Sequence, residues 1–273
     1  SRRRHTRYGT VTGVQTCALP ISLEPRWQIS TLLRLAERGA DLLICNSHYT
    51  RGLVLSVRPS LAQRAVVIHN GIEMPPPPPE AGPRSEGPLR VVCVGRIHPK
   101  KGQGVLVEAA TRARAEGRTW ELHFYGDALP EHQGLFDEIR AQVHAGGLDD
   151  TAYWHGFVAG PERYLDADVA TVPSVLPEEF SLVCAEAQHM MLPVVATGPG
   201  GPSEIVVEGE TGFIVPPKDA DALYRAIATL DDDRERARAM GVAGHERVDE
   251  RFTRRRYAEH VNTTLHSLAV DGR

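Results

Sequence analysis

The feature that most constrains the fold is a regular alternation of strand-like and helical segments from residue 89 to residue 250. Runs such as LRVVCVG, WELHFYG and DVATVPS have the apolar composition of buried strands, and the stretches between them have the apolar spacing of helices. Strands that alternate with helices of this length are typical of a parallel sheet covered by helices on both faces. We therefore predict an α/β fold for this part of the chain.

The residues before this block predict a second, smaller unit. Residues 22–73 contain a helical pattern and the strand-like runs DLLICN and RAVVIHNG, with Ser47 in the position of a helix N-cap. So few elements cannot bury the core of a two-layer domain, so we predict an incomplete domain. Residues 74–88, MPPPPPEAGPRSEGP, are rich in proline and predict a linker between the two units, with a surface loop as the alternative.

The two ends of the chain are less regular. Residues 1–21 begin with a basic stretch but lack the apolar region and the cleavage pattern of a signal peptide, so we leave them as an unassigned leader whose native origin stays open. Residues 251–273 predict a C-terminal helix with arginines at 251, 254, 255 and 256. This cluster fits either a solvated helix face or contact with an anionic membrane surface.

Composition excludes several classes of protein. The net charge of −4 provides no broad attraction to nucleic acid or to anionic lipid, so an anion site must be local. The four cysteines have no paired spacing, which indicates buried thiols in a reducing compartment and argues against metal ligands. No apolar run approaches the roughly 20 residues of a membrane helix. We expect a soluble, cytoplasmic chain, with peripheral contact at the inner face of the membrane left open.

The first motif that could carry chemistry is VGRIHPKKG. A strand ends at Gly95 and Arg96, and Lys101 follows at the start of a helix. Two cations beside the end of a strand suit a diphosphate, because arginine can grip it with a planar fork and lysine can neutralise it as a point charge. A solvated basic turn explains the same residues equally well. The spacing does not match a P-loop.

The second motif is PSVLPEEFSLVCAEA, between two strand-like runs. Glu178 lies in the predicted loop and Glu186 in the helix that follows, so both face the same crevice. The N–H groups at the helix start, near Ser181 to Val183, could bind an anion, while the carboxylates could accept hydrogen bonds from hydroxyl groups. Glutamate pairs at this spacing are also common by chance in an acidic chain.

Two glycine-containing motifs belong to the same edge of the sheet. FYGD and WHGFV place Gly126, Phe157 and Val158 there, where an apolar slot could hold a nucleobase. We expect Phe124 and Trp154, by contrast, to pack in the core.

In TGPGGPSEIV, Gly200 and Gly201 precede a short helix, and they suit either close approach to a ligand or a sharp turn. LDADVA contains Asp166 and Asp168, but Asp168 opens a strand at the edge away from the crevice. We interpret it as structural and predict no metal site there.

Taken in order, VGRIHPKKG, FYGD, WHGFV, PSVLPEEFSLVCAEA, LPVVAT, GGPSEIV and TGFIVP resemble the C-terminal domain of retaining glycosyltransferase family 4, which has the GT-B fold. The resemblance covers about residues 40–270. It implies a Rossmann-like, nucleotide-sugar-binding domain at 89–250, a remnant of the acceptor-side N-terminal domain at 22–73, and a C-terminal helix at 251–273 that packs back toward the N-terminal part.

The resemblance also implies roles for individual residues. Arg96 and Lys101 would bind the donor's diphosphate and Glu178 the donor sugar, and we take these three as catalytic. Glu186 would bind the ribose hydroxyls, and the base would lie near Val158. The full set of implied donor-binding residues is Gly95, Gly126, Val158, Glu179, Phe180, Ser181, Leu182, Val183 and Glu186. The family usually has glycine where this chain has Ser181, and often proline or glycine at position 179.

The implied reaction transfers a sugar from a nucleoside diphosphate sugar to a hydroxyl of a sugar or lipid-linked acceptor, with retention of the anomeric configuration. No cofactor or metal is expected, because cations and helix N–H groups can stabilise the departing diphosphate. A complete N-terminal domain would need roughly 100 or more residues before Leu23, so we expect this chain to carry mainly the donor-binding half. The alternatives are a nucleotide-sugar-binding module without turnover, and a GT-B epimerase or phosphorylase.

Overall fold

A computed structural model of the chain describes residues 15–16 and 26–271. The chain divides into two compact units, residues 1–69 and 70–273. The division falls between His69 and Asn70, ahead of the segment 74–88 in which the sequence predicted a linker. The predicted leader, residues 1–21, lies outside the described residues except for Gln15 and Thr16.

The smaller unit is a three-stranded parallel sheet with helices, and its strand order is β1-β2-β3. Its elements are β1 (Gln15–Thr16), α1 (Arg26–Gly39), β2 (Leu43–Cys45), α2 (His48–Val57), the 3-10 helix η1 (Pro59–Leu61) and β3 (Ala65–Val67). Ser47 is the N-cap of α2, as predicted: its hydroxyl accepts a hydrogen bond from the Thr50 N–H at 2.9 Å. The helical and strand patterns expected here are therefore confirmed, and β1 is an addition from the leader.

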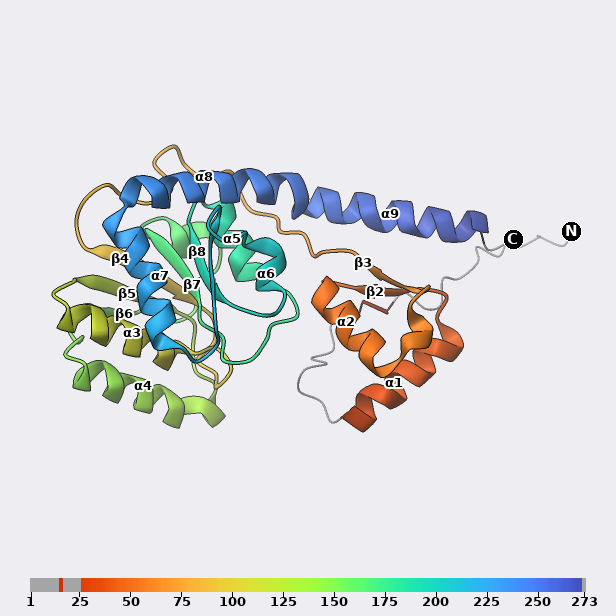
Figure 1. The fold of residues 1–273 in the computed structure, drawn as a ribbon, viewed down its shortest axis with the longest axis horizontal. Helices are drawn as coiled ribbons and strands as arrows, with labels where there is room; N and C mark the ends of the chain where they lie inside the picture. Colours follow the sequence, from red (N-terminus) through yellow and green to blue (C-terminus); the bar gives the residue numbers. More distant parts are fainter. Residues whose placement is uncertain (1–14, 17–25, 272–273) are drawn as a thin grey trace, which may run out of the picture. The chain divides into compact units, whose positions relative to one another are not determined.

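The larger unit contains the alternating elements that the sequence predicts (Figure 1). In chain order they are β4 (Leu89–Val94), α3 (Gln103–Ala115), β5 (Trp120–Tyr125), η2 (Pro130–His132), α4 (Gln133–Ala145), β6 (Ala152–Trp154), η3 (Pro161–Tyr164), β7 (Val169–Val172), α5 (Leu182–His189), β8 (Val194–Thr197), α6 (Pro202–Ile205), β9 (Gly212–Val215), α7 (Ala220–Asp232), α8 (Arg234–Arg251) and α9 (Arg254–Asp271).

All strands of this unit run parallel in one six-stranded sheet of order β6-β5-β4-β7-β8-β9. The order reverses at β4, which pairs with β5 on one side and with β7 on the other. The carboxyl ends of β4 and β7 therefore flank a topological switch point, where open α/β sheets bind ligands. The predicted doubly covered parallel sheet is confirmed.

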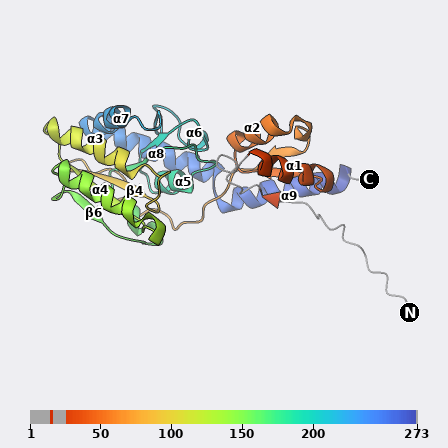
Figure 2. The same ribbon diagram turned by 90° about the horizontal axis from the view of Figure 1, so that it is seen from below.

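Successive side chains of the strands point to opposite faces of the sheet and pack into two separate hydrophobic cores. Leu89, Val91 and Cys93 of β4 join the core that includes buried residues of α3, α4 and α7. Val92, on the opposite side of β4, joins the core that includes buried residues of α5, α6 and α8. Figure 2 shows the same layers from below, with α3 and α4 side by side. The sheet is therefore packed on both faces by buried hydrophobic side chains, which fix the positions of the strand ends.

The Pro-rich segment, residues 74–88, packs along the rest of the larger unit through hydrogen bonds of its backbone and side chains. The carboxylate of Asp168, a fully buried residue, accepts hydrogen bonds from the Arg84 N–H at 2.7 Å and from the Arg84 guanidinium at 2.7 and 3.1 Å. The Arg238 guanidinium donates to the Pro83 carbonyl at 2.5 Å, and the His189 ring contacts the Pro75 carbonyl at 3.0 Å. These contacts explain why the units divide before the prolines, and they confirm Asp168 as structural.

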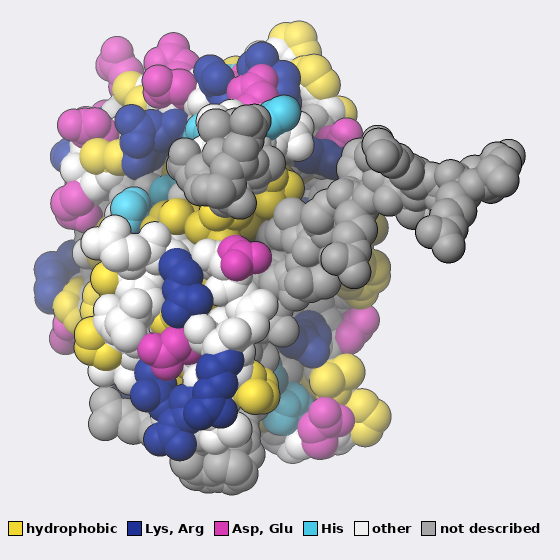
Figure 3. Space-filling view, turned by 90° about the vertical axis from the view of Figure 1, so that its right-hand side faces the viewer, with side chains coloured by type: hydrophobic (Ala, Val, Ile, Leu, Met, Phe, Trp, Pro, Cys, Tyr) yellow, Lys and Arg dark blue, Asp and Glu magenta, His cyan; other side chains and the backbone are white. Residues whose placement is uncertain are grey.

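Several smaller expectations concern side chains. Cys45, Cys93 and Cys184 are buried free thiols, and burial raises the pKa of both Cys93 and Cys184 to about 12; Cys17 lies outside the described residues. Each arginine of the C-terminal cluster forms an ion pair with a glutamate. Acidic and basic side chains lie among neutral and hydrophobic ones on the face drawn in Figure 3. Within the described part of the chain, no helix combines the length and the apolar character needed to cross a bilayer.

Candidate functional site

The candidate site is built from the loops that leave the carboxyl ends of β4, β5 and β7. The ends of β4 and β5 approach closely, because the Gly95 N–H donates to the Tyr125 carbonyl at 2.8 Å. A Cβ on Gly126 would lie 2.3 Å from the Gly95 carbonyl oxygen, and Gly126 has a φ of +134°. Only glycine fits there. The structure thus gives Gly126 a role in closing the two strand ends, beside the donor role that the resemblance implies.

Lys101 and Glu178, from the two loops that flank the switch point, form an ion pair. The Lys101 ammonium lies 2.6 Å from Oε1 of Glu178, and the Ser174 hydroxyl donates to the same oxygen at 2.6 Å. The loops are locked together by Gly102, whose φ of +68° and lack of a Cβ let it approach the Pro173 carbonyl. Both donors use Oε1, so Oε2 is the oxygen of Glu178 that is open to a ligand hydroxyl.

Arg96 lies beside this pair with its guanidinium exposed. No hydrogen bond or ion pair of the Arg96 side chain to a described residue is present, whereas its backbone carbonyl accepts a hydrogen bond from the buried amide of Gln103 at 3.0 Å. The Arg96 backbone is therefore fixed by Gln103, while its guanidinium is available to a ligand. This is the arrangement expected of an arginine that binds an anionic ligand.

Several positive charges surround a neighbouring imidazole, that of His98. The pKa of His98 is lowered below 6.5, mainly by burial and also by the charges of His132, Lys100, Arg96 and Lys101. The His98 ring also accepts a hydrogen bond from the Lys100 N–H at 3.1 Å. The loop after β4 therefore concentrates positive potential where a diphosphate would bind.

The start of α5 adds backbone donors to the same edge. The N-cap of α5 is Ser181, a buried residue whose hydroxyl accepts a hydrogen bond from the Cys184 N–H at 3.4 Å. The first helical N–H groups, those of Leu182 and Val183, have no partner within the helix and can face an anion. Serine at this position thus caps the helix, which accounts physically for its use where the family usually has glycine.

Glu186 is held from one side by two donors that sequence reasoning did not identify. The Arg163 guanidinium and the Tyr164 hydroxyl donate to Oε2 of Glu186 at 2.7 and 2.8 Å. The same guanidinium donates to the Val158 carbonyl at 3.1 Å. Arg163 therefore connects the predicted ribose residue to the predicted base position, and Oε1 of Glu186 is the oxygen open to a ligand. Burial raises the pKa of Tyr164 well above 10, so this hydroxyl keeps its proton.

Two glycines of the loop after β8, Gly200 and Gly201, pack against the backbone of residues 178–180. The Gly201 N–H donates to the Glu178 carbonyl at 2.7 Å, and a Cβ on Gly201 would lie 2.5 Å from the Glu179 carbonyl oxygen. A Cβ on Gly200 would lie 2.9 Å from the Glu178 carbonyl oxygen. The sequence offered close approach to a ligand or a sharp turn as the reason for these glycines, and the structure adds a third reason, which is close packing against the loop 178–180. The Phe180 ring faces Phe252, with centroids 6.0 Å apart.

Aromatic residues near the site divide as the sequence analysis expected. Phe124 is 1% exposed and stacks on Trp154 at a centroid distance of 4.4 Å, so both belong to the core. Phe157, by contrast, is 74% exposed, and Val158 is half-buried. The loop that follows β6 therefore presents apolar side chains at the surface, and Arg163 is bonded to it through the Val158 carbonyl.

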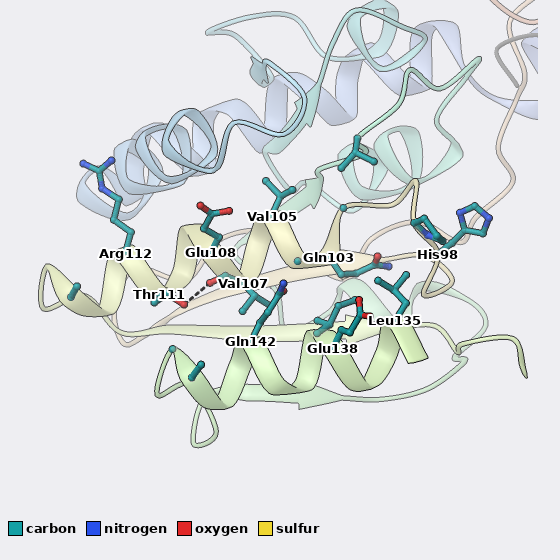
Figure 4. A pocket seen from close by; sticks show the side chains of 18 residues that line it. His98, Gln103, Val105, Val107, Glu108, Thr111, Arg112, Leu135, Glu138 and Gln142 are labelled. Carbon is teal, nitrogen blue, oxygen red and sulfur yellow. Dashed lines mark hydrogen bonds between the residues drawn. The ribbon is translucent and has the colours of Figure 1, made fainter. Parts of the chain in front are cut away.

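A separate groove of about 750 Å³ runs between α3 and α4 (Figure 4). Its walls are mostly helix side chains such as Val105, Thr111, Leu135 and Gln142. None of the predicted donor-binding residues lines it. The cations, carboxylates and helix N–H groups described above lie at the strand edge and not in this groove.

Three side chains of the site escaped the sequence analysis, namely Ser174, Arg163 and Tyr164. Ser174 lies two residues after the end of β7, so its place at a strand's carboxyl end was a usable signal. Arg163 and Tyr164 lie in the short helix η3, in the sequence PERY. Their distance from Glu186 along the chain hides the contact, and only the fold brings them together.

The comparison with protein families agrees with this geometry. Residues 88–233 match the family described as glycosyl transferases group 1. A lipopolysaccharide core biosynthesis mannosyltransferase of Rhizobium leguminosarum bv. viciae is 31% identical over 214 residues, covering 76% of this chain and 61% of the relative. A GDP-mannose-dependent alpha-(1-6)-phosphatidylinositol monomannoside mannosyltransferase of Mycobacterium tuberculosis is 30% identical over 237 residues, covering 80% and 60%. The chain thus spans about three fifths of the length of these relatives.

Solved structures show the same fold. The Anabaena protein Alr3699/HepE, in a complex with UDP, superposes with a TM-score of 0.82 at 25% identity, covering 92% of this chain and 70% of that one. Sucrose-phosphate synthase from Thermosynechococcus elongatus superposes with a TM-score of 0.76 at 26% identity, covering 93% and 64%. These neighbours are glycosyltransferases with the GT-B fold.

Proposed function

Because the chain belongs to the glycosyl transferases group 1 family, we propose that it carries the donor-binding half of a retaining glycosyltransferase. The enzyme would move a hexosyl group from a nucleoside diphosphate sugar to a hydroxyl of a sugar or lipid-linked acceptor. The observation that carries this proposal is the convergence of Arg96, Lys101, the start of α5 and two half-open carboxylates at one switch point of the sheet.

Each group has a distinct task in the proposed reaction. As the bond between the anomeric carbon and the diphosphate breaks, negative charge grows on the departing oxygen. Arg96, Lys101 and the N–H groups of Leu182 and Val183 stabilise that charge, which is the largest electrostatic demand of the step. Glu178 orients the sugar through Oε2, and Glu186 orients the ribose through Oε1. The acceptor hydroxyl attacks the anomeric carbon on the face that the diphosphate leaves and passes its proton to the departing phosphate oxygen, which preserves the configuration.

The ion pair between Lys101 and Glu178 has a consequence for binding. The diphosphate would draw the Lys101 ammonium toward itself, so the 2.6 Å contact with Glu178 weakens as the donor enters. Glu178 then keeps the Ser174 hydroxyl as a partner and gains a sugar hydroxyl. The pair thus holds both side chains in position before the donor binds, which reduces the entropy lost on binding.

Titration calorimetry with UDP, GDP, UDP-glucose and GDP-mannose tests the proposal. For whichever of these nucleotides binds the parent protein, Arg96→Ala should lower the affinity about 10–100-fold, as expected for the loss of hydrogen bonds to a charged group. The matched control is Arg114→Ala, since Arg114 lies on α3 and pairs with Asp150 at the surface. Equal affinities of Arg96→Ala and the parent protein would contradict the proposal.

Two further functions are compatible with donor binding and differ in turnover. A nucleotide-sugar-binding module would bind the donor without consuming it, and a GT-B epimerase or phosphorylase would consume it without transfer to an acceptor hydroxyl. A time course of donor consumption with mannoside and lipid-linked acceptors separates these, with the anomeric configuration of the product read by NMR. Inversion of the configuration would contradict the retaining mechanism.

A further inference from the structure

A cluster of two histidines and one aspartate lies at the end of α5 that is remote from the candidate site. His189 is the last residue of α5, and His245 and Asp249 share one face of α8, where they are one turn apart. One ligand atom from each of the three side chains lies within 4.8 Å of the other two. His189 is only 8% exposed, whereas the Asp249 side chain is 53% exposed.

Close packing of α5 and α8 brings these residues together. A Cβ on Gly241 would lie 1.9 Å from the Met191 carbonyl oxygen, and one on Gly244 would lie 3.0 Å from the Gln188 side chain. Glycines at these two positions of α8 let its backbone rest on the end of α5. The next residue of α8, His245, is thereby carried to the ring of His189, with centroids 5.1 Å apart.

The hydrogen bonds of the two rings determine which nitrogen carries the proton. The His189 Nε2 lies 3.0 Å from the Pro75 carbonyl oxygen, and the His245 Nδ1 lies 2.6 Å from the His189 carbonyl oxygen. A carbonyl only accepts, so both of these nitrogens must donate. In the neutral rings the remaining nitrogens, Nδ1 of His189 and Nε2 of His245, therefore present lone pairs.

Both lone pairs are directed at a carboxylate, which has no proton to offer. The His189 Nδ1 is buried without a hydrogen-bond partner, although it lies only 3.3 Å from Oδ1 of Asp249. The His245 Nε2 lies 3.7 Å from Oδ2 of the same carboxylate. Three electron-rich groups thus converge on one point with no donor between them, and a buried polar atom without a partner is costly. A cation between them would satisfy all three.

We propose that His189, His245 and Asp249 bind a divalent transition metal ion of the zinc class. Imidazole and carboxylate are ligands that suit Zn²⁺, and a histidine that binds a metal almost always donates its other ring N–H to a carbonyl or carboxylate, as both rings do here. Metal–ligand distances of about 2.0–2.2 Å separate the donors of a tetrahedral ion by roughly 3.4 Å. The two histidine nitrogens lie 3.3 and 3.7 Å from different oxygens of Asp249, and one ligand atom of each side chain lies within 4.8 Å of the other two. Small shifts of the side chains would therefore close the set around an ion.

The ion would have a structural role in the larger unit. It would join α5 to α8, and the His189 ring would extend the link to the segment around Pro75. The exposed side of Asp249 provides an entry path and leaves a fourth coordination position for water. This site is distinct from the donor crevice, for which no metal is expected, and it does not depend on the proposed transfer reaction.

Calorimetric titration of the chelator-treated full chain with ZnCl₂ tests the proposal. The parent protein should bind zinc at a site whose affinity falls at least about 10-fold in Asp249→Asn and in His245→Ala. Co²⁺ should produce the intense visible bands of a tetrahedral site in the parent and not in Asp249→Asn. The control is His144→Ala, which removes an exposed histidine that pairs only with Asp149 and should leave zinc binding unchanged.

Asp249→Asn is nearly isosteric and half-exposed, so its fold should survive, which circular dichroism can verify. Zinc should raise the Tm of the parent and of His144→Ala and should leave the Tm of Asp249→Asn unchanged. Zinc affinities of Asp249→Asn and His245→Ala equal to that of the parent would overturn the proposal. So would a parent protein that binds no zinc, because a proton shared between a ring and the carboxylate would then be the occupant.

Discussion

Two edges of the six-stranded sheet hold carboxylates beside arginine or lysine, and they hold them differently. At the amino edge, Asp168 is fully buried and both of its oxygens accept hydrogen bonds. Oδ1 accepts from the N–H and the guanidinium of Arg84. Oδ2 accepts from the Arg84 guanidinium and from the Arg90 N–H, the latter at 2.8 Å. At the carboxyl edge, the side chains of Glu178 and Glu186 are 14% and 19% exposed. Each of these receives its two donors on a single oxygen.

The difference separates a structural carboxylate from one prepared for a ligand. A carboxylate with both oxygens occupied has its hydrogen-bonding capacity used by the protein, so it anchors the chain. A carboxylate fixed through one oxygen is oriented and still has an acceptor to offer. The charges at the two edges are similar, and the free oxygen is what distinguishes them. Each prediction below tests this distinction.

The largest effect is expected at the amino edge. Asp168→Ala should reduce the free energy of unfolding by about 3–5 kcal/mol, because the backbone N–H groups of Arg84 and Arg90 and the Nε of Arg84 lose their acceptor and a buried ion pair is broken. Urea denaturation measures the change. Asp166→Ala is the control: its side chain is 90% exposed, and the expected change is within about 0.5 kcal/mol. Similar losses in the two variants would remove the structural role assigned to Asp168.

At the carboxyl edge the same kind of change should affect binding more than stability. Glu186→Gln keeps an acceptor for Arg163 and Tyr164 but loses the charge that faces the ligand. Affinity for the nucleotide that binds should fall about 10–100-fold, while the free energy of unfolding should change by less than about 1 kcal/mol. Calorimetry and denaturation measure the two effects. Glu246→Gln, on the exposed face of α8, is the control, and a stability loss as large as that of Asp168→Ala would erase the distinction.

Removing a positioning residue should have a smaller effect. Tyr164→Phe deletes one of the two donors to Oε2 of Glu186 and leaves Arg163 in place. Nucleotide affinity should fall roughly 2–10-fold, the usual range for one hydrogen bond. Glu186→Gln combined with Tyr164→Phe should be less than additive, because both changes act on one contact. Full additivity in the double-mutant cycle would show that Tyr164 does not act through Glu186.

The smallest effect is a change in the titration of His98. Its pKa lies below 6.5 mainly because the ring is partly buried, and also because His132, Lys100, Arg96 and Lys101 oppose a further positive charge. A bound diphosphate would neutralise that field, so the pKa should rise on binding. The donor then binds the protonated form better, and affinity should increase as the pH falls from the bound-state pKa of His98 to its lower free-state pKa.

NMR titration of the His98 ring, with and without a nucleoside diphosphate sugar, measures this pKa. In Arg96→Ala the pKa of the free protein should lie higher than in the parent, and its rise on binding should be smaller. An unchanged pKa in the presence of saturating donor would place the diphosphate away from the loop after β4.

The fold was largely predictable because its signals are local. The apolar runs of β4, β5, β7 and β8 are flanked by helical patterns, and parallel strands joined by helices admit few arrangements. The linker was harder to predict, because proline content shows that a segment cannot enter a sheet and says nothing of what it packs against. Asp168 and Arg84 are far apart in the sequence, and their contact appears only when the chain folds.

The part of the candidate site that lies at strand ends was predictable for the same reason. Arg96, Lys101 and Glu178 follow strand ends, so the strand pattern alone brings them to one edge. Arg163 and Tyr164 reach Glu186 across a loop, and His189 reaches Asp249 across two helices, so no short motif marks either cluster. The only local sign of the cluster around His189 was the spacing of His245 and Asp249, which are four residues apart on one helix.

The most direct test of the proposed site is a crystal structure of the chain with the nucleoside diphosphate that binds it. We expect the diphosphate between Arg96, Lys101 and the start of α5, with the ribose hydroxyls on Oε1 of Glu186 while Arg163 and Tyr164 stay on Oε2. A nucleotide bound in the groove between α3 and α4, or a Glu186 that has released both of its donors, would contradict it.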